Sequence, residues 1–450
     1  MNNLIVGLDI GTCNVRAVIA ELSEDGGLTV IGVGSSPSTG LRKGVVLNIE
    51  ATLKAIKTAI ESAELMAGCE VTSCYVAIGG SQIESFNSKG MVTVQSKEKE
   101  KGKGHEIREI DQSDIDNAIK CASSIMIPMD RDILHVCPQS YIVDGQDGLK
   151  EPLAMIGMHL EVEVLLVTAS VTATQNIVRC VNRASYGVDG LMLKTLAAAR
   201  SVMTQEERNL GSILIDLGGG TTDVLVVYDD APLCICSIPI GGQMVTNDIA
   251  IVKGITTENA EKIKIDAGCC WEPLLDTYEE VLLPGIGGRA PEIITRQELC
   301  QIIQPRVQEI LEMTRDKLAL LTKSKQLSGN IVLCGGGALM HGIADLTSYV
   351  FDTTAVRIGN SAKMGGLLDE YHTPQFATAT GIVLTQTDII RKKIETGELQ
   401  IRETKQRDNA LGRDLIAGLK EFFKSFFLWF SLCNFFAQFY SLFINLLIFS

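Results

Sequence analysis

The chain has 450 residues, of which 46% are hydrophobic, and a formal net charge of −14. A chain of this length exceeds what one hydrophobic core usually supports, so we expect two or more domains. The negative charge argues against general nucleic-acid binding, and the thirteen cysteines lack the paired spacing of a zinc site, which favours reduced thiols in a cytosolic protein.

A strand that ends in a glycine turn opens the chain. Residues 4–10 and 15–20 predict two strands, and Asp9-Ile10-Gly11-Thr12 lies at the bend between them. Glycine lets backbone N–H groups approach a phosphate, and a threonine hydroxyl donates to phosphate oxygens. The aspartate repels phosphate, so its presence suggests Mg²⁺ or a metal-bound water between the two. Taken alone, this first glycine turn is equally compatible with an ordinary bend.

The character of the sequence changes at about residue 84 and returns at about residue 164. We therefore predict a small inserted subdomain at 84–164. Its alternating charge run at 97–104 predicts a solvated loop, with a docking surface as the alternative. The elements expected in this first part are strands at 28–35, 75–79, 91–94, 134–144 and 160–167, and helices at 49–66 and 113–124.

A second glycine turn repeats the pattern of the first one. It comprises residues 218–221, follows the apolar run at 213–215, and has aspartates at both ends, Asp216 and Asp223. Three glycines and two threonines make this copy much more specific than the first. Two such hairpins about 200 residues apart predict two similar half-molecules that clamp one nucleotide.

The rest of the chain predicts further helices at 172–184, 195–203, 256–267, 295–322 and 378–384, and a buried strand at 330–337. The predicted domains are a lobe 1 core (1–83 and 165–203), a lobe 2 core (204–252 and 326–385) and a lobe 2 outer subdomain (253–325). Residues 386–412 are polar and mixed in charge, which predicts a flexible linker.

The last segment, 413–450, predicts a membrane-associating helix. Its first part is basic and amphipathic, as in helices that lie in a membrane interface. No charge occurs from Ser425 to Ser450, a stretch of 26 residues. This stretch is long enough to span a bilayer, but its polar residues recur on one narrow stripe, so an orientation in the membrane plane is equally favoured. The apolar face comprises Leu415, Ile416, Leu419, Phe422, Phe423 and Phe426.

Taken together, these motifs resemble a known superfamily. Both glycine turns, and the strand and glycines at 331–338, are similar to the nucleotide-binding motifs of actin, Hsp70 and the sugar kinases. Within that superfamily, the insertion, the segment at 287–299 and the amphipathic tail resemble the FtsA family of bacterial cell-division proteins. The resemblance implies an actin-like α/β ATPase fold with two lobes of duplicated ribonuclease-H-like units, an FtsA-type inserted subdomain and a C-terminal membrane-targeting helix.

The resemblance also implies a function and a set of site residues. The expected protein binds ATP with Mg²⁺, polymerises at the cytoplasmic face of the inner membrane at the division site, and anchors FtsZ filaments there with other division proteins. Asp9 and Asp216, the implied catalytic residues, would hold the hydration shell of Mg²⁺. Glu261 and Lys264 resemble a pair that grips adenosine; the alternative is a surface ion pair. The other implied nucleotide-binding residues are Gly11, Thr12, Cys13, Asn14, Gly218, Gly219, Gly220, Thr221, Thr222, Gly335, Gly336 and Gly337.

Two departures from the superfamily pattern bear on catalysis. Asn14 stands where relatives often have a lysine against the phosphates, and its neutral side chain predicts weaker phosphate binding. No glutamate or glutamine in the segment 167–171 is placed to orient an attacking water. We therefore expect at most a slow ATPase that serves mainly as a nucleotide-dependent scaffold.

Other functions remain as alternatives. Arg289 and Arg296 would suit an acidic peptide of FtsZ, although ordinary solvated charges explain each of them as well. A small-molecule kinase of the superfamily would need an aspartate base and gains nothing from an apolar tail. A PilM-like pilus or secretion adaptor would lack the membrane helix, and an Hsp70-like chaperone would need more than the roughly 65 residues after position 385.

Overall fold

The structure is a computed structural model that describes residues 4–23, 26–94, 108–276, 278–285, 290–322 and 329–396. These residues belong to one compact unit, Leu4–Gln400. The charged loop at 97–104, the partner residue Arg289, the end of the linker and the membrane helix at 413–450 lie outside the described residues. What the sequence indicates for these segments stays a prediction.

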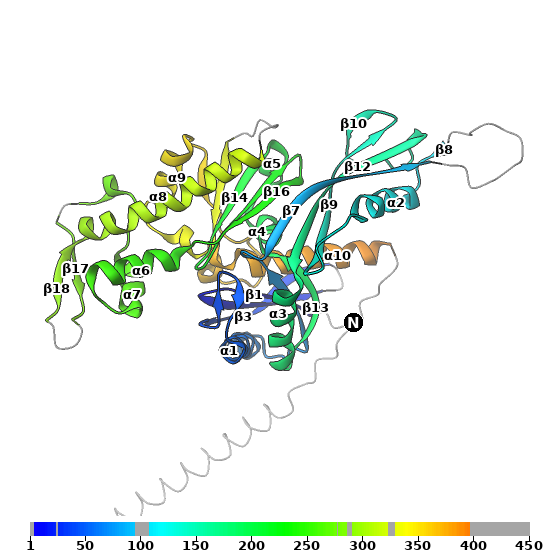
Figure 1. Ribbon diagram of the computed structural model, residues 1–450. Coiled ribbons are helices and arrows are strands. Elements are labelled where there is room, and N and C mark those ends of the chain that lie inside the picture. Colours follow the sequence, from blue (N-terminus) through cyan, green and yellow to red (C-terminus); the bar gives the residue numbers. More distant parts are fainter. Residues whose placement is uncertain are drawn as a thin grey trace, which may run out of the picture. The chain divides into compact units, whose positions relative to one another are not determined.

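Two five-stranded sheets with the same strand order form the core of the two lobes (Figure 1). In each sheet, three antiparallel strands joined by hairpins are followed by two strands that run parallel to the first. This repetition confirms the prediction of duplicated half-molecules. The first sheet, in chain order, is β1 (Leu4–Ile10), β2 (Asn14–Leu22), β3 (Leu28–Pro37), β6 (Ser73–Ile78) and β13 (Gly187–Leu193). The second is β14 (Ser212–Leu217), β15 (Thr222–Tyr228), β16 (Ala231–Ile238), β19 (Asn330–Cys334) and β20 (Val356–Ile358).

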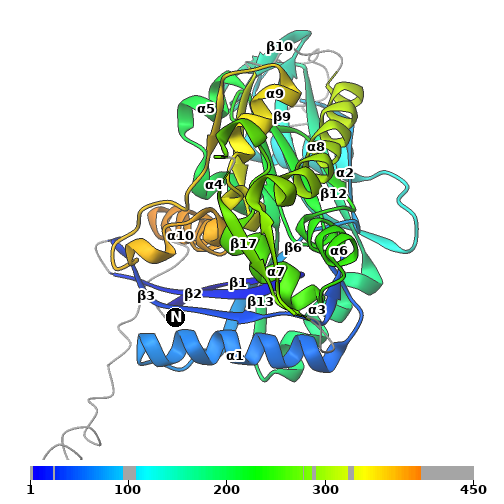
Figure 2. The ribbon, with the colours of Figure 1, turned by 90° about the vertical axis from the view of Figure 1, so that its left-hand side faces the viewer.

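Helices bury both faces of the first sheet. Helices α1 (Ile49–Ala67) and α3 (Val171–Arg183) cover one face, and Figure 2 shows α1 running beneath β1, β2 and β3. Helices α4 (Lys194–Val202) and α10 (Ala377–Glu395) cover the opposite face. Because α4 also packs its alanines against the second sheet, it belongs to the cores of both lobes. The short strands β4 (Leu41–Arg42) and β5 (Val45–Val46) precede α1.

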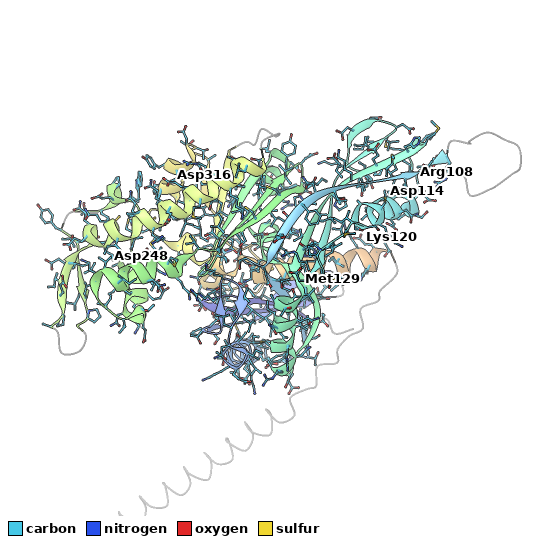
Figure 3. All side chains as sticks on the ribbon, viewed as in Figure 1. Arg108, Asp114, Lys120, Met129, Asp248 and Asp316 are labelled. Carbon is cyan, nitrogen blue, oxygen red and sulfur yellow. The ribbon has the colours of Figure 1, made fainter. Side chains whose placement is uncertain are left out.

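The inserted subdomain is a four-stranded antiparallel sheet with one helix packed on it. Figure 3 labels Asp114 in the first turn of that helix and Arg108 on the short strand before it, and the guanidinium donates to the carboxylate at 2.6 and 2.7 Å. Its first strand begins well before the expected start at residue 91, because half-exposed polar residues hid its apolar alternation. The elements are β7 (Ile83–Thr93), β8 (Arg108–Glu109), α2 (Gln112–Ser123), β9 (Arg131–Val143), β10 (Gln146–Leu149), β11 (Ile156–Gly157) and β12 (His159–Ser170).

The second sheet is covered by helices of lobe 2, and three α-helices of this lobe, α5, α6 and α9, were not predicted from the sequence. Helix α6 has few buried apolar residues, and its start is held by main-chain bonds to the second glycine turn, so periodicity gave no signal. Helix α8, expected at 295–322, is observed with Thr295 as its cap. The elements are α5 (Gln205–Leu210), α6 (Gly242–Lys253), α7 (Thr257–Ala267), η1 (Glu272–Leu274), β17 (Glu280–Leu283), β18 (Glu292–Thr295), α8 (Arg296–Leu321), η2 (Gly336–Leu339) and α9 (Ile343–Phe351).

Helix α10 corrects the predicted start of the linker. The sequence placed a helix at 378–384 and a flexible linker from 386, but the helix continues to Glu395. Thr387 is buried on its inner face, and Asp388 pairs with Arg200 at 2.8 Å. These polar residues after position 386 therefore belong to a packed helix and not to a flexible linker. Two short turns, η3 (Asp369–Tyr371) and η4 (Pro374–Phe376), precede it. Among the described helices, none is both long and apolar enough to cross a membrane.

His135 joins the inserted subdomain to lobe 1 and makes stability depend on pH. Its Nε2 accepts a hydrogen bond from Leu193 N–H at 2.9 Å, and burial lowers the pKa of His135 from 6.5 to about 4. The unfolded chain therefore takes up a proton before the folded one, and the stabilisation present above pH 6.5 is lost as pH falls towards 4. We expect His135→Gln to remove about 2 to 3 kcal/mol of this pH dependence, measured by urea unfolding.

The matched control is His159→Gln, because the imidazole of His159 is half exposed. Its free energy of unfolding should follow the wild-type pH curve within about 0.5 kcal/mol. Parallel curves for wild type and His135→Gln would contradict the assignment.

Candidate functional site

The two glycine turns touch each other. A Cβ added to Gly219 would lie 2.3 Å from Cys13 Sγ, and one added to Gly220 would lie 2.7 Å from Thr12 Oγ1. Any side chain at these two positions would push the turns apart. Glycine is therefore required for the two lobes to close on a common site.

Both turns have the same internal geometry. Gly11 N–H donates to Asn14 O at 2.9 Å, and Gly218 N–H donates to Thr221 O at 3.0 Å. The start of α6 fixes the second turn further, because Gly242 N–H donates to Gly218 O at 2.9 Å. The duplicated motif of the sequence thus corresponds to a duplicated backbone structure.

Three aspartates and two basic side chains line a cavity of about 90 Å³ beside the turns. Asp9 and Asp216 end β1 and β14, and Asp223 lies on β15. Lys194 Nζ lies 2.6 Å from Asp9 Oδ1, and Arg16 lines the same cavity from β2. The other predicted residues along this cavity are Gly11, Thr12, Cys13, Asn14, Gly218, Thr221, Gly335 and Gly336.

Burial and mutual repulsion disfavour full ionisation of this acidic cluster. Burial, and then the charge of Asp223, raise the pKa of Asp216 to about 7. Burial also raises the pKa of Asp223, although hydroxyl hydrogen bonds from Ser237 and Thr221 oppose that shift. Burial lowers the pKa of Lys194, but Asp9 and its neighbouring carboxylates more than offset this, so the ammonium is retained. A further cation in the cavity would favour the ionised aspartates.

These carboxylates suit a hydrated Mg²⁺ ion. Magnesium prefers oxygen ligands and keeps several of its waters, and it is commonly held by one or two carboxylates together with phosphates. Asp9 and Asp216 supply such oxygens at the edge of the cavity. Among the described residues, no three acidic, histidine or cysteine side chains are arranged to hold a metal directly.

A larger cavity of about 440 Å³ adjoins the acidic cavity, with which it shares six lining residues, and is lined mostly by residues of lobe 2. The size is sufficient for a small-molecule ligand, and apolar side chains of α8 and η2 form much of its wall. Gly336 and Gly337 line one side of the cavity, and the packing of a nucleoside against them stays a prediction. The remaining wall includes Gly219, Thr222, Gly241, Gly242, Val245, Val307, Ile310, Met340 and Ile343.

Glu261 and Lys264 form an ion pair in the wall of this larger cavity. Lys264 Nζ lies 2.7 Å from Glu261 Oε2 and also donates to Thr246 Oγ1 at 2.8 Å and to Gly242 O at 3.2 Å. The Lys264 side chain is only 11% exposed. The pair therefore connects α7 to α6 beside the cavity and is not an isolated, solvated pair, whereas its role towards a ligand stays a prediction.

The hydroxyls of the second glycine turn have internal partners. Thr221 Oγ1 donates to Asp223 Oδ2 at 3.2 Å, and Thr222 Oγ1 donates to Ile240 O at 3.0 Å. Donation from these threonines to a phosphate would require each hydroxyl to give up its present acceptor. Backbone N–H groups are the donors that this turn offers most directly.

Positive charge at the site comes from residues that sequence reasoning did not select. Asn14 is neutral, as noted, but Arg16 lies two residues further along β2 and lines both cavities. Its Nη2 donates to Gln375 Oε1 at 2.9 Å, and its guanidinium lies 5.5 Å from the centre of the Phe376 ring. Within the described part of the chain, its Nε has no hydrogen-bond partner. Alternation along the strand, which puts residues 14 and 16 on one face, was the available signal. The weaker phosphate binding expected from the neutral Asn14 stays a prediction.

Arg296 has internal contacts in the structure. Its Nη1 lies 2.6 Å from Glu279 Oε2, and its Nε donates to Ala267 O at 2.8 Å. It also borders the larger cavity. A freely solvated charge does not describe Arg296, and its contact with a partner peptide stays a prediction.

Comparison with known proteins gives matches over most of the chain. The family model "Cell division protein FtsA" matches residues 213–381, and the model "SHS2 domain inserted in FTSA" matches residues 80–168. The cell division protein FtsA of Borreliella burgdorferi is 43% identical over 383 residues, which cover 85% of this chain and 90% of the relative. FtsA of Escherichia coli K12 is 38% identical over 387 residues, covering 84% and 89%.

Solved structures show a similar fold at low sequence identity. The PilM–PilN type IV pilus biogenesis complex matches with a TM-score of 0.60 and 16% identity, covering 85% of this chain and 98% of the other. MreB 5 of Spiroplasma citri bound to AMPPNP matches with a TM-score of 0.51 and 15% identity, covering 88% and 99%. These likenesses confirm the actin-like fold.

The site makes one prediction about stability. Gly335 has a φ of +81°, and an added Cβ would lie 2.2 Å from Asp216 Oδ1. We expect Gly335→Ala to lower the free energy of unfolding by about 2 to 4 kcal/mol, through backbone strain and this clash. Urea unfolding measures the effect.

The neighbouring Gly336 provides the control. An added Cβ there meets no atom within 4 Å, so Gly336→Ala should change stability by less than about 1 kcal/mol. Equal stability of the two variants would contradict the requirement for glycine at 335.

Proposed function

Because the chain belongs to the FtsA family of cell-division proteins, we propose that it binds ATP with Mg²⁺ between its lobes and assembles into filaments at the inner membrane. There it anchors FtsZ filaments at the division site. The observation that carries this proposal is the contact of the two glycine turns over an acidic cavity that opens into a larger cavity. In this arrangement the phosphates lie at the turns and the nucleoside lies in lobe 2.

The residues divide the work of holding the nucleotide. Asp9 and Asp216 position the hydrated metal, and the backbone of both turns cradles the phosphates. Lys264 and Glu261 lie beside the nucleoside. The metal supplies charge neutralisation of the triphosphate when it is bound. Hydrolysis is slow at most, because the segment 167–171 offers no carboxylate or amide to orient a water.

The inserted subdomain links nucleotide binding to assembly. The subdomain is inserted within the sequence of lobe 1, but it also contacts lobe 2. Ser85 Oγ donates to Ile235 O of lobe 2 at 2.8 Å and accepts from Ile235 N–H at 3.2 Å. Gln139 Nε2 donates to Pro232 O on the same edge strand at 2.8 Å. A ligand that fixes the angle between the lobes therefore also fixes this subdomain, through which copies contact one another in the filament.

The tail provides membrane affinity. Its basic amphipathic part suits a lipid surface, and polymerisation multiplies a weak affinity for each copy by avidity. FtsZ binds lobe 2 near Arg296 through its acidic terminal peptide. The division site at the inner membrane is then the location of the assembled protein.

Nucleotide binding can be tested at α7. We expect Lys264→Ala to weaken ATP binding about tenfold, since a charged wall contact is lost beside the ligand. Isothermal titration with Mg-ATP measures the change. The control is Lys262→Ala on the same helix, whose pair with Glu258 is exposed at 68% and 82%. It should bind ATP within about twofold of wild type. Unchanged affinity in Lys264→Ala would contradict the nucleoside position.

Anchoring can be tested by co-sedimentation with lipid vesicles and FtsZ, with and without Mg-ATP. The full-length chain with Mg-ATP should bring FtsZ into the vesicle pellet, because filament formation adds avidity to the tail. A chain truncated after Asn409 should leave FtsZ in the supernatant. Recovery of FtsZ on vesicles with the truncated chain would refute the anchoring model.

A further inference from the structure

Lys194 occupies an unusual position in the acidic cavity. It is the first residue of α4, yet its ammonium reaches across to β1, where it lies 2.6 Å from Asp9 Oδ1 and donates to Ile10 O at 3.0 Å. The side chain is only 14% exposed. A lysine so enclosed has a fixed ammonium rather than a mobile surface charge.

Two features of neighbouring elements hold Lys194 in place. The stem crosses Gly79, where an added Cβ would lie 2.9 Å from Lys194 Cδ and 3.0 Å from Cγ. The preceding residue, Leu193, donates its N–H to His135 Nε2. Because residue 79 is glycine, the aliphatic part of the Lys194 side chain has room to cross it. His135 fixes the backbone of the preceding residue, Leu193.

The balance of charge shows what Lys194 contributes. Asp9, Asp216 and Asp223 carry three negative charges when ionised, and Lys194 and Arg16 carry two positive charges, which leaves a net charge of −1. Without Lys194 the net charge would be −2, and a triphosphate would meet stronger repulsion. Both cations line the acidic cavity, but Arg16 faces the larger cavity as well, whereas Lys194 lies in direct contact with Asp9.

We propose that Lys194 acts as a tethered cation that supplies part of the positive charge usually provided by Mg²⁺, so that ATP binding depends only weakly on the metal. This inference rests on the proposed ATP-binding function. Lys194 pairs with Asp9 and leaves its second carboxylate oxygen, together with Asp216, to hold a hydrated Mg²⁺ when the metal is bound. Because the ammonium is present in every copy, the phosphates meet a cation before any metal arrives.

The test compares ATP affinity in Mg²⁺ with ATP affinity in excess EDTA, by isothermal titration of the full chain. In wild type, chelation should weaken binding by less than about tenfold. In Lys194→Met, which keeps the length of the stem and removes the charge, chelation should weaken binding by about a hundredfold or more. The matched control is Lys253→Met, since Lys253 is equally enclosed, 14% exposed, in an ion pair with Glu298 outside the site. In this control, chelation should weaken ATP binding by the same factor as in wild type.

A second variant keeps the lysine and displaces it. The added methyl group of Gly79→Ala displaces the aliphatic part of the Lys194 side chain. We therefore expect EDTA to weaken ATP binding more in Gly79→Ala than in wild type, as in Lys194→Met. If Lys194→Met fails to fold, the factor by which EDTA weakens ATP binding to the wild-type chain tests the inference by itself.

The outcomes separate the two proposals. The role of Lys194 would be overturned if EDTA weakened ATP binding by the same factor in wild type and in Lys194→Met. It would also be overturned if wild-type binding were lost completely in EDTA. Neither outcome would contradict the binding of Mg-ATP. Tighter Mg-ATP binding in Lys194→Met would also overturn the role of Lys194, because the lysine would then be a competitor of the metal. Absence of wild-type binding even in Mg²⁺ would refute the proposed function itself.

Discussion

The site depends on one constraint, which is that two glycine turns from separate sheets must lie so close that side chains of the first turn contact bare backbone of the second. Gly219 against Cys13 and Gly220 against Thr12 leave no room for a Cβ. The same closeness gathers three aspartates in one small cavity, and such a concentration of negative charge is unfavourable in a buried environment. Lys194 and Arg16 offset most of it. The close approach of the lobes is therefore favourable only because these two cations lie in the same cavity as the aspartates.

Much of this arrangement can be predicted from the sequence, because the information is local. Each strand, aspartate and glycine turn is contiguous, so the duplication of Asp9–Thr12 at Asp216–Thr221 indicates both the fold and the place where the lobes meet. Residues that act from a distance give no such signal. Lys194 is 184 positions from Ile10, whose carbonyl it contacts, and it begins an alanine-rich helix with no distinctive motif. Its position depends on Gly79 and His135, which only the tertiary structure brings together.

The other differences have similar physical causes. Strand β7 was predicted too short because half of its side chains face solvent and break the apolar alternation. Helix α6 buries only Val245, Thr246 and Ile249, and the second glycine turn holds its start. Polar composition after residue 386 suggested a linker, whereas Asp388 makes a specific contact with Arg200. In each case tertiary contacts outweigh local propensity.

Helix α10 is gripped along its length by elements from across the molecule. Gly381 packs so closely on Ala197 that an added Cβ would lie 1.8 Å from its carbonyl oxygen, and Thr380 Oγ1 lies 2.8 Å from Ser201 Oγ. Near its end, the Arg391 guanidinium donates to Gly26 O beside β3. The polypeptide after Glu395 continues directly from this helix. Any mechanical load on that continuation passes along α10 into its buried contacts with α4 and the first sheet, and not into a peripheral element that would unfold first.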